Sequence, residues 1–207
     1  TLFRSLEKSA QLGNVNAQYL LGKVCLEIGI GNPAQAISWI TKAAEAGNVG
    51  AQYALGKLYR DGTHVEKDIQ KAVAMFTAAA GQKNEYAAYQ LGRLYLSDED
   101  ISKNVPEAVK WFTLSSNLGN AYAQYALGKL YLSGDGVPKD VGEAIRLFTL
   151  SAEKKNEYAA YQIGKLYLQG EDVPKDVETA IRWLTVSAEH GNQFAQYALG
   201  KLYFYDG

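Results

Sequence analysis

Apolar residues recur along this chain at the three- and four-residue spacing of amphipathic helices, in short stretches separated by polar segments. The stretch Tyr158–Leu168 is representative, and a helical wheel divides it into an apolar face and a polar face. The apolar face holds Ala159, Ile163, Leu166 and Tyr167. Gly164 borders that face. The pattern predicts an amphipathic helix with one buried side.

A second helix is predicted after the loop at 169–176, whose sequence QGEDVPKD combines helix breakers with charges. The carboxylate of Asp176 suits the N-cap of this helix, which is expected to run to about Glu189. Its inward-facing residues are Ala180, Ile181, Leu184 and Ala188. Gly191 then suits the left-handed position after a helix, and Asn192 suits the cap of the next one. The structural unit is therefore a helical hairpin.

This unit is repeated along the chain. The string AQYALGKLY stands identically at 51–59, 123–131 and 195–203, with the variants AQYLLGKVC at 17–25, AAYQLGRLY at 87–95 and AAYQIGKLY at 159–167. The shared glycines are Gly22, Gly56, Gly92, Gly128, Gly164 and Gly200, spaced by 34 residues once and then by 36. A fixed period of this size indicates a stacked repeat, which offers a binding surface along its length. A glycine inside a helix costs roughly 1 kcal/mol relative to alanine, so its return in every copy predicts close approach by another helix.

The chain is predicted to be all-α, with about twelve helices in one repeat domain over residues 1–207. The expected boundaries are a partial repeat at 1–14, five repeats at 15–48, 49–84, 85–120, 121–156 and 157–192, and a partial repeat at 193–207. The second helix of each full repeat carries an alanine at Ala36, Ala72, Ala108, Ala144 and Ala180, and a large residue one turn later at Ile40, Phe76, Phe112, Phe148 and Leu184. A threonine follows each large residue and is expected to bond back to the carbonyl four residues earlier. Because neither end falls on a repeat boundary and residue 1 is not Met, we expect a fragment of a larger protein.

Three motifs recur over nearly the whole chain: A-x-Y-x-L-G-x-L-Y, a loop of the type G-x-x-V-P-K-D, and A-x-x-W/F-x-x-x-A/S-A/S followed by Gly-Asn. In these motifs the chain resembles the Sel1-like repeat family, relatives of the tetratricopeptide repeat (TPR). The loops at 27–33 and 97–104 depart from the motif, the second by carrying Ser102 and Asn104 in place of Pro and Asp. The resemblance implies a right-handed α–α superhelix (solenoid), with the first helix of each repeat lining a concave face. It also implies a role as an adaptor in protein complexes.

Three hypotheses for function follow. The first is a non-enzymatic scaffold that binds a protein or peptide on its concave face. The second is an accessory region of a larger bacterial protein, because runs such as AQYALGKLYLSGDGVPKD at 123–140 look like the repeats behind the catalytic domain of some plasmid-mobilising relaxases. No relaxase nuclease motif accompanies them here. A hydrolase that uses the groove ranks last.

The first helix of each repeat has a second, non-core side that carries a tyrosine and, four residues later, a lysine or arginine. Another aromatic residue precedes most of these tyrosines by three positions. The candidate binding residues are Tyr53, Lys57, Tyr86, Tyr89, Arg93, Tyr122, Tyr125, Lys129, Tyr158, Tyr161, Lys165, Tyr197 and Lys201, with Tyr19, Lys23 and Phe194 at equivalent positions. Stacking would align rings and cations, which suits an acidic, extended peptide. Alternatively, the tyrosines pack against the neighbouring repeat and the lysines serve only as a solvated row.

Composition limits the partners. The net charge of −1 gives no general attraction to nucleic acid or anionic membrane. Aromatic residues interleaved with cations also suit single-stranded nucleic acid, but loop acids are expected to repel phosphate: Asp61, Asp98, Glu99, Asp100, Asp135, Glu171 and Asp172. No apolar run reaches the length of about 18 residues that spans a bilayer. A single cysteine and no visible signal peptide favour the cytoplasm.

Catalytic and metal motifs are weak. Gly56-Lys57 lies one residue too far from Gly50 for a phosphate-binding loop, and it falls within a helix. Cys25 replaces the tyrosine of the other copies and is interpreted as a core substitution. The two histidines, His64 and His190, are far apart in sequence, and the acidic run at 98–100 does not follow the calcium-loop pattern. We therefore expect no metal, no cofactor and no catalytic residues.

Overall fold

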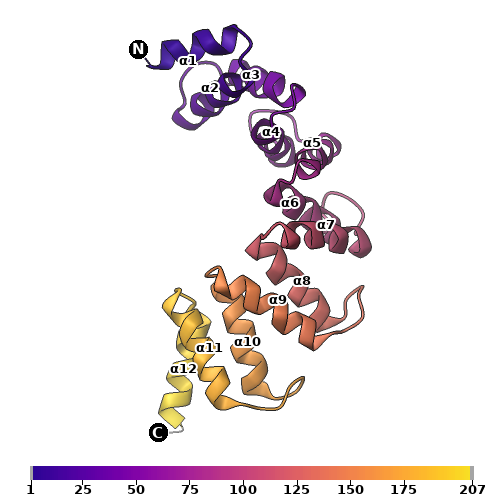
Figure 1. Ribbon diagram of the computed structural model, residues 1–207, viewed down its shortest axis with the longest axis vertical. Helices are drawn as coiled ribbons and strands as arrows, with labels where there is room; N and C mark the ends of the chain where they lie inside the picture. The colour runs from indigo at the N-terminus through magenta and orange to yellow at the C-terminus, as the bar shows by residue number, and fades with distance from the viewer. Residues whose placement is uncertain (1, 206–207) are drawn as a thin grey trace. The chain divides into compact units, whose positions relative to one another are not determined.

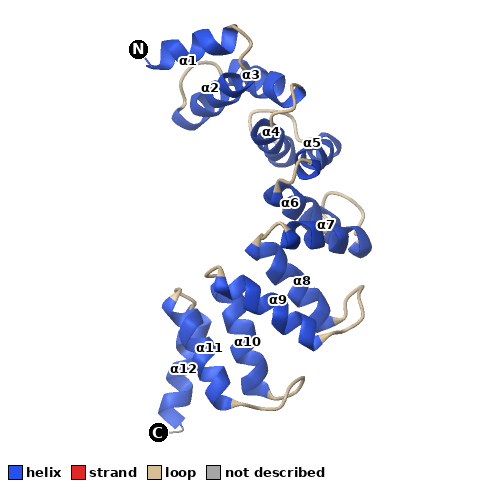
Figure 2. Ribbon diagram, in the orientation of Figure 1, coloured by secondary structure: helices blue, strands red, loops and turns tan. Residues whose placement is uncertain are grey.

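The computed structural model describes residues 2–205, which form α-helices joined by loops (Figure 1). Within these residues there are twelve helices and no strand (Figure 2). They are α1 Leu2–Gln11, α2 Val15–Ile28, α3 Pro33–Glu45, α4 Val49–Asp61, α5 Ile69–Gly81, α6 Glu85–Leu96, α7 Val105–Asn117, α8 Ala121–Ser133, α9 Val141–Glu153, α10 Glu157–Gln169, α11 Val177–Glu189 and α12 Gln193–Tyr205. The prediction of an all-α repeat fold is confirmed. We call the even-numbered helices A helices and the odd-numbered ones B helices.

The chain divides into two compact units, residues 1–103 and 104–207. The first unit contains α1 to α6 and the second contains α7 to α12. Inside each unit the packing is sequential, so that a B helix lies between the A helix before it and the A helix after it. Thus α3 packs on α2 and α4 in the first unit, and α9 packs on α8 and α10 in the second (Figure 1).

Side-chain caps begin the helices, as predicted. Asparagines start the A helices: the Oδ1 of Asn48 accepts the backbone N–H of Ala51 at 2.8 Å, and the Oδ1 of Asn192 accepts that of Ala195 at 2.9 Å. Aspartates start most B helices, and the Oδ1 of Asp176 accepts the N–H of Thr179 at 3.0 Å. The divergent loop at 97–104 also ends in a cap, because Asn104 Oδ1 accepts the backbone N–H of Glu107 at the start of α7 at 3.1 Å.

Three of the loops that connect an A helix to the following B helix form a backbone hydrogen bond with that A helix. In the three loops with the Lys-Asp ending, the backbone N–H of the capping aspartate donates to the last-turn tyrosine carbonyl of the preceding A helix at 2.9 Å. The aspartate and tyrosine pairs are Asp68 with Tyr59, Asp140 with Tyr131 and Asp176 with Tyr167. This bond fixes the direction in which each B helix sets out. The loop sequence therefore determines how the hairpin closes.

The glycines of four A helices receive a large side chain from the next B helix. A Cβ placed on Gly128 would lie 2.6 Å from the ring of Phe148, and one on Gly56 would lie 2.8 Å from the ring of Phe76. The predicted close approach is thus confirmed, and the approaching group is a side chain of the same hairpin. Gly22, Gly56, Gly128 and Gly164 receive Ile40, Phe76, Phe148 and Leu184 respectively. At Gly200 in α12 no atom lies within 4 Å of such a Cβ.

The buried core follows the predicted small and large positions. The five alanines and the five large residues of the B helices are all buried, and Phe76, Phe112 and Phe148 are among the largest side chains with almost no exposed surface. One predicted threonine bond is present at Thr149, whose Oγ1 donates to the carbonyl of Ile145 at 2.9 Å. Buried serines also join the two helices of a hairpin. Ser151 Oγ in α9 donates to the carbonyl of Ala121 in α8 at 2.7 Å.

Candidate functional site

The A-helix tyrosines pack between the core and the next repeat. In the first unit the Tyr53 ring centroid lies 5.9 Å from Phe76 and 6.3 Å from Tyr86. In the second unit Tyr125 repeats these contacts, at 5.8 Å from Phe148 and 6.4 Å from Tyr158. These separations are typical of interacting aromatic rings. The rings therefore link neighbouring repeats, as the packing interpretation expects. Tyr53 and Tyr125 are half-buried, whereas Tyr197 in α12 is 69% exposed.

The aromatic residues of the first helical turn are more open to solvent. Tyr86, Tyr122 and Tyr158 are 51%, 59% and 51% exposed, and Phe194 is 65% exposed. The first unit therefore presents one such ring, Tyr86 in α6, and the second unit presents one in each of α8, α10 and α12. We call the surface formed by the candidate tyrosines, phenylalanine and cations the A-helix face.

The cations of the A-helix face lie beside their tyrosines, as predicted from the four-residue spacing. The Lys57 ammonium is 5.9 Å from the Tyr53 ring centroid, and the Lys129 ammonium is 5.9 Å from that of Tyr125. Arg93 and Lys201 have the same relation to Tyr89 and Tyr197, at 5.9 and 5.8 Å. A cation at this distance from a ring keeps its donors available while its stem is held in place.

These cations make no ion pair. In the part of the chain that the structure describes, no ion pair involves Lys57, Arg93, Lys129, Lys165 or Lys201. Some lysines and arginines of the loops and B helices pair with acids: Lys67 with Asp100, Lys71 with Asp68, Lys110 with Glu107, Lys139 with Asp172, Arg146 with Glu143 and Arg182 with Glu178. Others among the described residues, such as Lys42, Lys83 and Lys155, also make no ion pair. On the A-helix face, Lys23 is near an acid, at 3.7 Å from Glu27. The A-helix face thus carries a row of cations whose charge no ion pair compensates.

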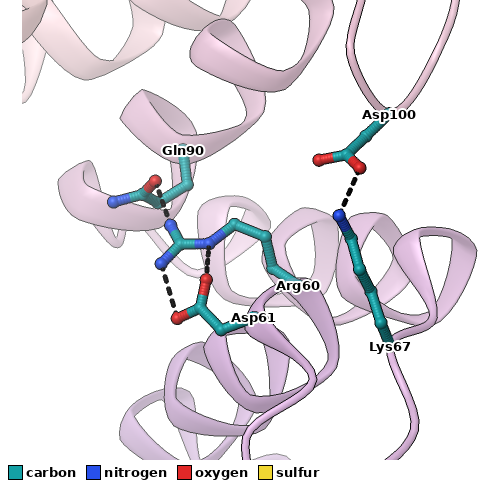
Figure 3. Close-up of polar contacts among 5 residues, drawn as sticks. All are labelled: Arg60, Asp61, Lys67, Gln90 and Asp100. Atoms are coloured by element: carbon teal, nitrogen blue, oxygen red, sulfur yellow. Dashed lines mark hydrogen bonds and ion pairs between the residues drawn. The ribbon is translucent and has the colours of Figure 1, made fainter.

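One arginine of an A helix is held in a fixed network (Figure 3). In α4 the Arg60 guanidinium donates to both carboxylate oxygens of Asp61, at 2.6 and 2.9 Å, and to Oε1 of Gln90 in α6 at 2.6 Å. The hydrogen bonds from Arg60 lower the pKa of the Asp61 carboxyl, and those to Asp61 raise the pKa of Arg60. The network joins α4 and α6, the A helices of two successive repeats, and the Asp61 carboxylate compensates the Arg60 charge.

Acidic residues of the loops also form ion pairs with lysines. Lys67 Nζ lies 2.5 Å from Asp100 Oδ1 (Figure 3), and Lys139 Nζ lies 2.5 Å from Asp172 Oδ1. Each pair joins the loops of two successive repeats, across 33 residues of sequence. Sequence reasoning missed these pairs, although the recurring lysine before the capping aspartate of these loops was a signal for them. Asp61, Asp100 and Asp172 are therefore largely neutralised, and their repulsion of anions is weaker than expected.

Three hollows lie between successive A helices. The hollow between α2 and α4 has a volume of about 480 Å³, that between α4 and α6 about 690 Å³, and that between α10 and α12 about 550 Å³. Each is lined by a lysine or arginine of the A-helix face: Lys57, Arg93 and Lys201 respectively. Volumes of this order suit side chains of a bound segment. The A-helix face is therefore grooved as well as charged.

The remaining candidates make structural contacts. Cys25 is half-buried, and this burial, with the nearby Glu7 charge, raises the pKa of its thiol, opposite to the shift that activates a nucleophile. His190 lies at the end of α11 as predicted, with its Nδ1 2.7 Å from the carbonyl of Val186. Asp98 accepts the backbone N–H of Lys103 at 3.1 Å and so helps to close its loop. In residues 2–205 no cluster of three or more His, Cys, Asp or Glu side chains has the arrangement of a metal site.

Across the described range 2–205, no helix combines the length and the apolar character needed to cross a bilayer. The longest helix, α2, has 14 residues.

Comparison with known proteins gives a consistent result. The family model named Sel1 repeat matches residues 15–48, 49–84, 85–120, 121–156, 157–192 and 193–207. No match was found among curated proteins. The matched segments together cover most of the chain, so the similarity is not confined to one repeat.

Solved structures with the same fold were also found. The chain is similar to c5321, a protective antigen present in uropathogenic Escherichia coli strains that displays an SLR fold, with a TM-score of 0.93, 30% identity, and coverage of 99% of this chain and 44% of that one. A Sel1 repeat protein from Oxalobacter formigenes gives a TM-score of 0.81 and 32% identity, covering 93% of this chain and 79% of that one. Immunity protein Pa5087 from Pseudomonas aeruginosa, at 24% identity, TM-score 0.55 and coverage of 87% and 67%, shares the fold alone. The chain thus spans less than half the length of c5321.

Proposed function

Because the chain belongs to the Sel1 repeat family, we propose that it is a non-enzymatic scaffold whose A-helix face binds an acidic, extended segment of a partner protein. Sel1 repeat proteins generally serve as scaffolds for protein–protein interaction, and repeat arrays of this type offer an extended surface for such contacts. The proposed ligand is a peptide of negative charge, and every proposed binding residue lies on an A helix.

The observation that carries the proposal is the row of cations and rings on the A-helix face. Within the described residues Lys57, Arg93, Lys129, Lys165 and Lys201 make no ion pair. Lys57, Arg93, Lys129 and Lys201 lie beside tyrosine rings of the same helices. Carboxylates of a bound segment would pair with these cations through charge-assisted hydrogen bonds. The exposed rings beside them would contact its apolar groups.

An extended peptide is favoured over nucleic acid by the composition of the surface. The grooves between A helices have apolar residues such as Leu58 and Leu202 beside each cation. Nucleic acid binding depends mainly on dense positive charge along the backbone, but this chain has a net charge of −1. Alternating apolar and acidic side chains fit the grooves better than a phosphate backbone.

The test is a charge reversal in the second unit, with a peptide selected from a random 12-residue display library as the probe. We expect Lys129→Glu with Lys165→Glu to weaken binding of the selected peptide at least tenfold, because two favourable charge pairs become repulsive. Fluorescence anisotropy of the labelled peptide measures the affinity. Both lysines are exposed and unpaired, so the far-UV circular dichroism spectrum should not change.

The matched control is Lys155→Glu with Lys175→Glu, which changes the net charge equally in loops of the same unit. This control should bind the peptide within about twofold of the unchanged chain, since its cations lie off the A-helix face. Equal loss of affinity in both double variants would show a general charge effect. Full affinity in the Lys129 and Lys165 variant would contradict the proposal.

A further inference from the structure

Resting on the proposed function, we infer that the hollow between α2 and α4 is an anchor pocket for one large apolar side chain of the acidic segment. The class of side chain is that of phenylalanine, leucine or tryptophan. The pocket lies wholly in the first unit, and its shape depends on two residues that differ from their equivalents in later repeats. Those residues are Ile40 in α3 and Gly50 in α4.

The floor of the pocket is deepened by Ile40. This side chain is 1% exposed, and it both fills the notch of Gly22 and lines the hollow. The equivalent position holds a phenylalanine in the next three repeats, and there the rings of Phe76 and Phe148 reach out to touch Tyr53 and Tyr125. An isoleucine has no ring to make this aromatic contact, and the Ile40 side chain lines the hollow instead.

The mouth of the pocket is opened by Gly50. The equivalent first-turn positions hold Tyr86, Tyr122, Tyr158 and Phe194, which stand exposed on the A-helix face. Because Gly50 has no side chain, the Tyr19 ring lies directly against the backbone, 2.7 Å from where a Cβ of residue 50 would be. The ring thus forms one wall of the hollow, and no aromatic side chain stands over the entrance at residue 50. A substitution at Gly50 would displace that wall.

The lining is apolar within and carries charges of both signs at the rim. Leu26, Ala54 and Leu58 line the hollow together with Ile40 and the rings of Tyr19 and Tyr53. At the rim, Lys23 lies 3.7 Å from Glu27 and Arg60 donates to Asp61, whereas the Lys57 ammonium makes no ion pair with a described residue. An apolar side chain next to a carboxylate is therefore complementary to this site.

The other two hollows differ at the first-turn position. Between α4 and α6 this position holds Tyr86, and the lining includes Arg60, which donates to both Asp61 and Gln90. Between α10 and α12 the lining is also apolar, but the position equivalent to Gly50 is Phe194, whose ring packs 6.0 Å from Tyr161. Among these three hollows, that between α2 and α4 alone has a glycine at the first-turn position.

The experiment selects peptides from the random 12-residue display library on the full chain and keeps those whose binding Lys57→Glu weakens, so that they bind in the first unit. We expect selected peptides to share a large apolar residue flanked by Asp or Glu. Replacing that residue by alanine in the peptide should weaken binding about tenfold. In the protein, Ala54→Phe should fill the pocket and remove this preference, whereas Ala198→Phe, the same change at the equivalent position of α12, should leave it intact. Isotope labelling of isoleucine methyls gives a second readout, since the Ile40 signal should shift when the selected peptide is added.

The outcomes separate the pocket from the proposed function. Selected acidic peptides that bind equally well with alanine at every apolar position would overturn the pocket and leave the proposed function standing. Affinity lost in Ala198→Phe but kept in Ala54→Phe, or an Ile40 methyl signal that does not move, would also overturn it. A selection that yields no acidic peptides would remove the proposed function, and the pocket with it.

Discussion

Phe148→Ala is expected to lower the free energy of unfolding of the second unit by about 3–5 kcal/mol, because it empties the centre of a hairpin. The Phe148 ring has no exposed surface, fills the notch at Gly128 and packs 5.8 Å from Tyr125. Its removal therefore leaves a cavity between α8 and α9. Denaturant unfolding followed by circular dichroism measures the loss, and hydrogen exchange should show the lowest protection in these two helices.

Phe194→Ala is the matched control, since the same side chain is removed from a position that is 65% exposed. We expect a loss of less than about 1 kcal/mol there. If Phe148→Ala destabilised the chain no more than Phe194→Ala, the core would not be organised around the large residue of each B helix.

Gly128→Ala is expected to destabilise the same hairpin by about 1–3 kcal/mol, against the usual preference of helices for alanine. The new Cβ would lie 2.6 Å from the Phe148 ring, so either the ring or the helix must move. The measurement is the midpoint of denaturant unfolding, compared at constant slope.

Gly200→Ala is expected to have the opposite effect on stability. No atom lies within 4 Å of a Cβ at this position, so alanine should stabilise α12 by up to roughly 1 kcal/mol. Opposite effects at Gly128 and Gly200 would establish that the repeated glycine serves helix packing. A stabilising Gly128→Ala would show that the notch is not tight.

Features that depend on local sequence were predicted well. The capping role of Asp176 and Asn192, the end of a helix near Gly191 and the burial of Phe148 follow from residue type and spacing alone, and the structure confirms them. The close approach at Gly164 was predictable because only an interhelical contact justifies the energetic cost of a glycine in mid-helix. These features repeat with the sequence, so each copy supports the assignment of the others.

Polar contacts between neighbouring repeats were not predicted, because they depend on side-chain geometry across helices distant in sequence. The Lys67–Asp100 pair and the Arg60–Gln90 bond are of this kind. The two interpretations of the tyrosines proved compatible, since one ring such as Tyr53 packs against the next repeat while its lysine stays unpaired. The assignment of the A-helix face as a binding surface stays a prediction.

The most direct test of that assignment is paramagnetic broadening of protein methyl signals by the selected peptide carrying a nitroxide label. The account predicts that methyl signals of the A-helix groove where the peptide binds, such as those of Leu58 in the first unit or of Leu202 in the second, lose intensity when the labelled peptide is added. Signals of Ile37 in α3 and Ile181 in α11 should keep theirs. Broadening confined to the B-helix signals, with Leu58 and Leu202 unchanged, would contradict the proposal that the A helices bind the partner.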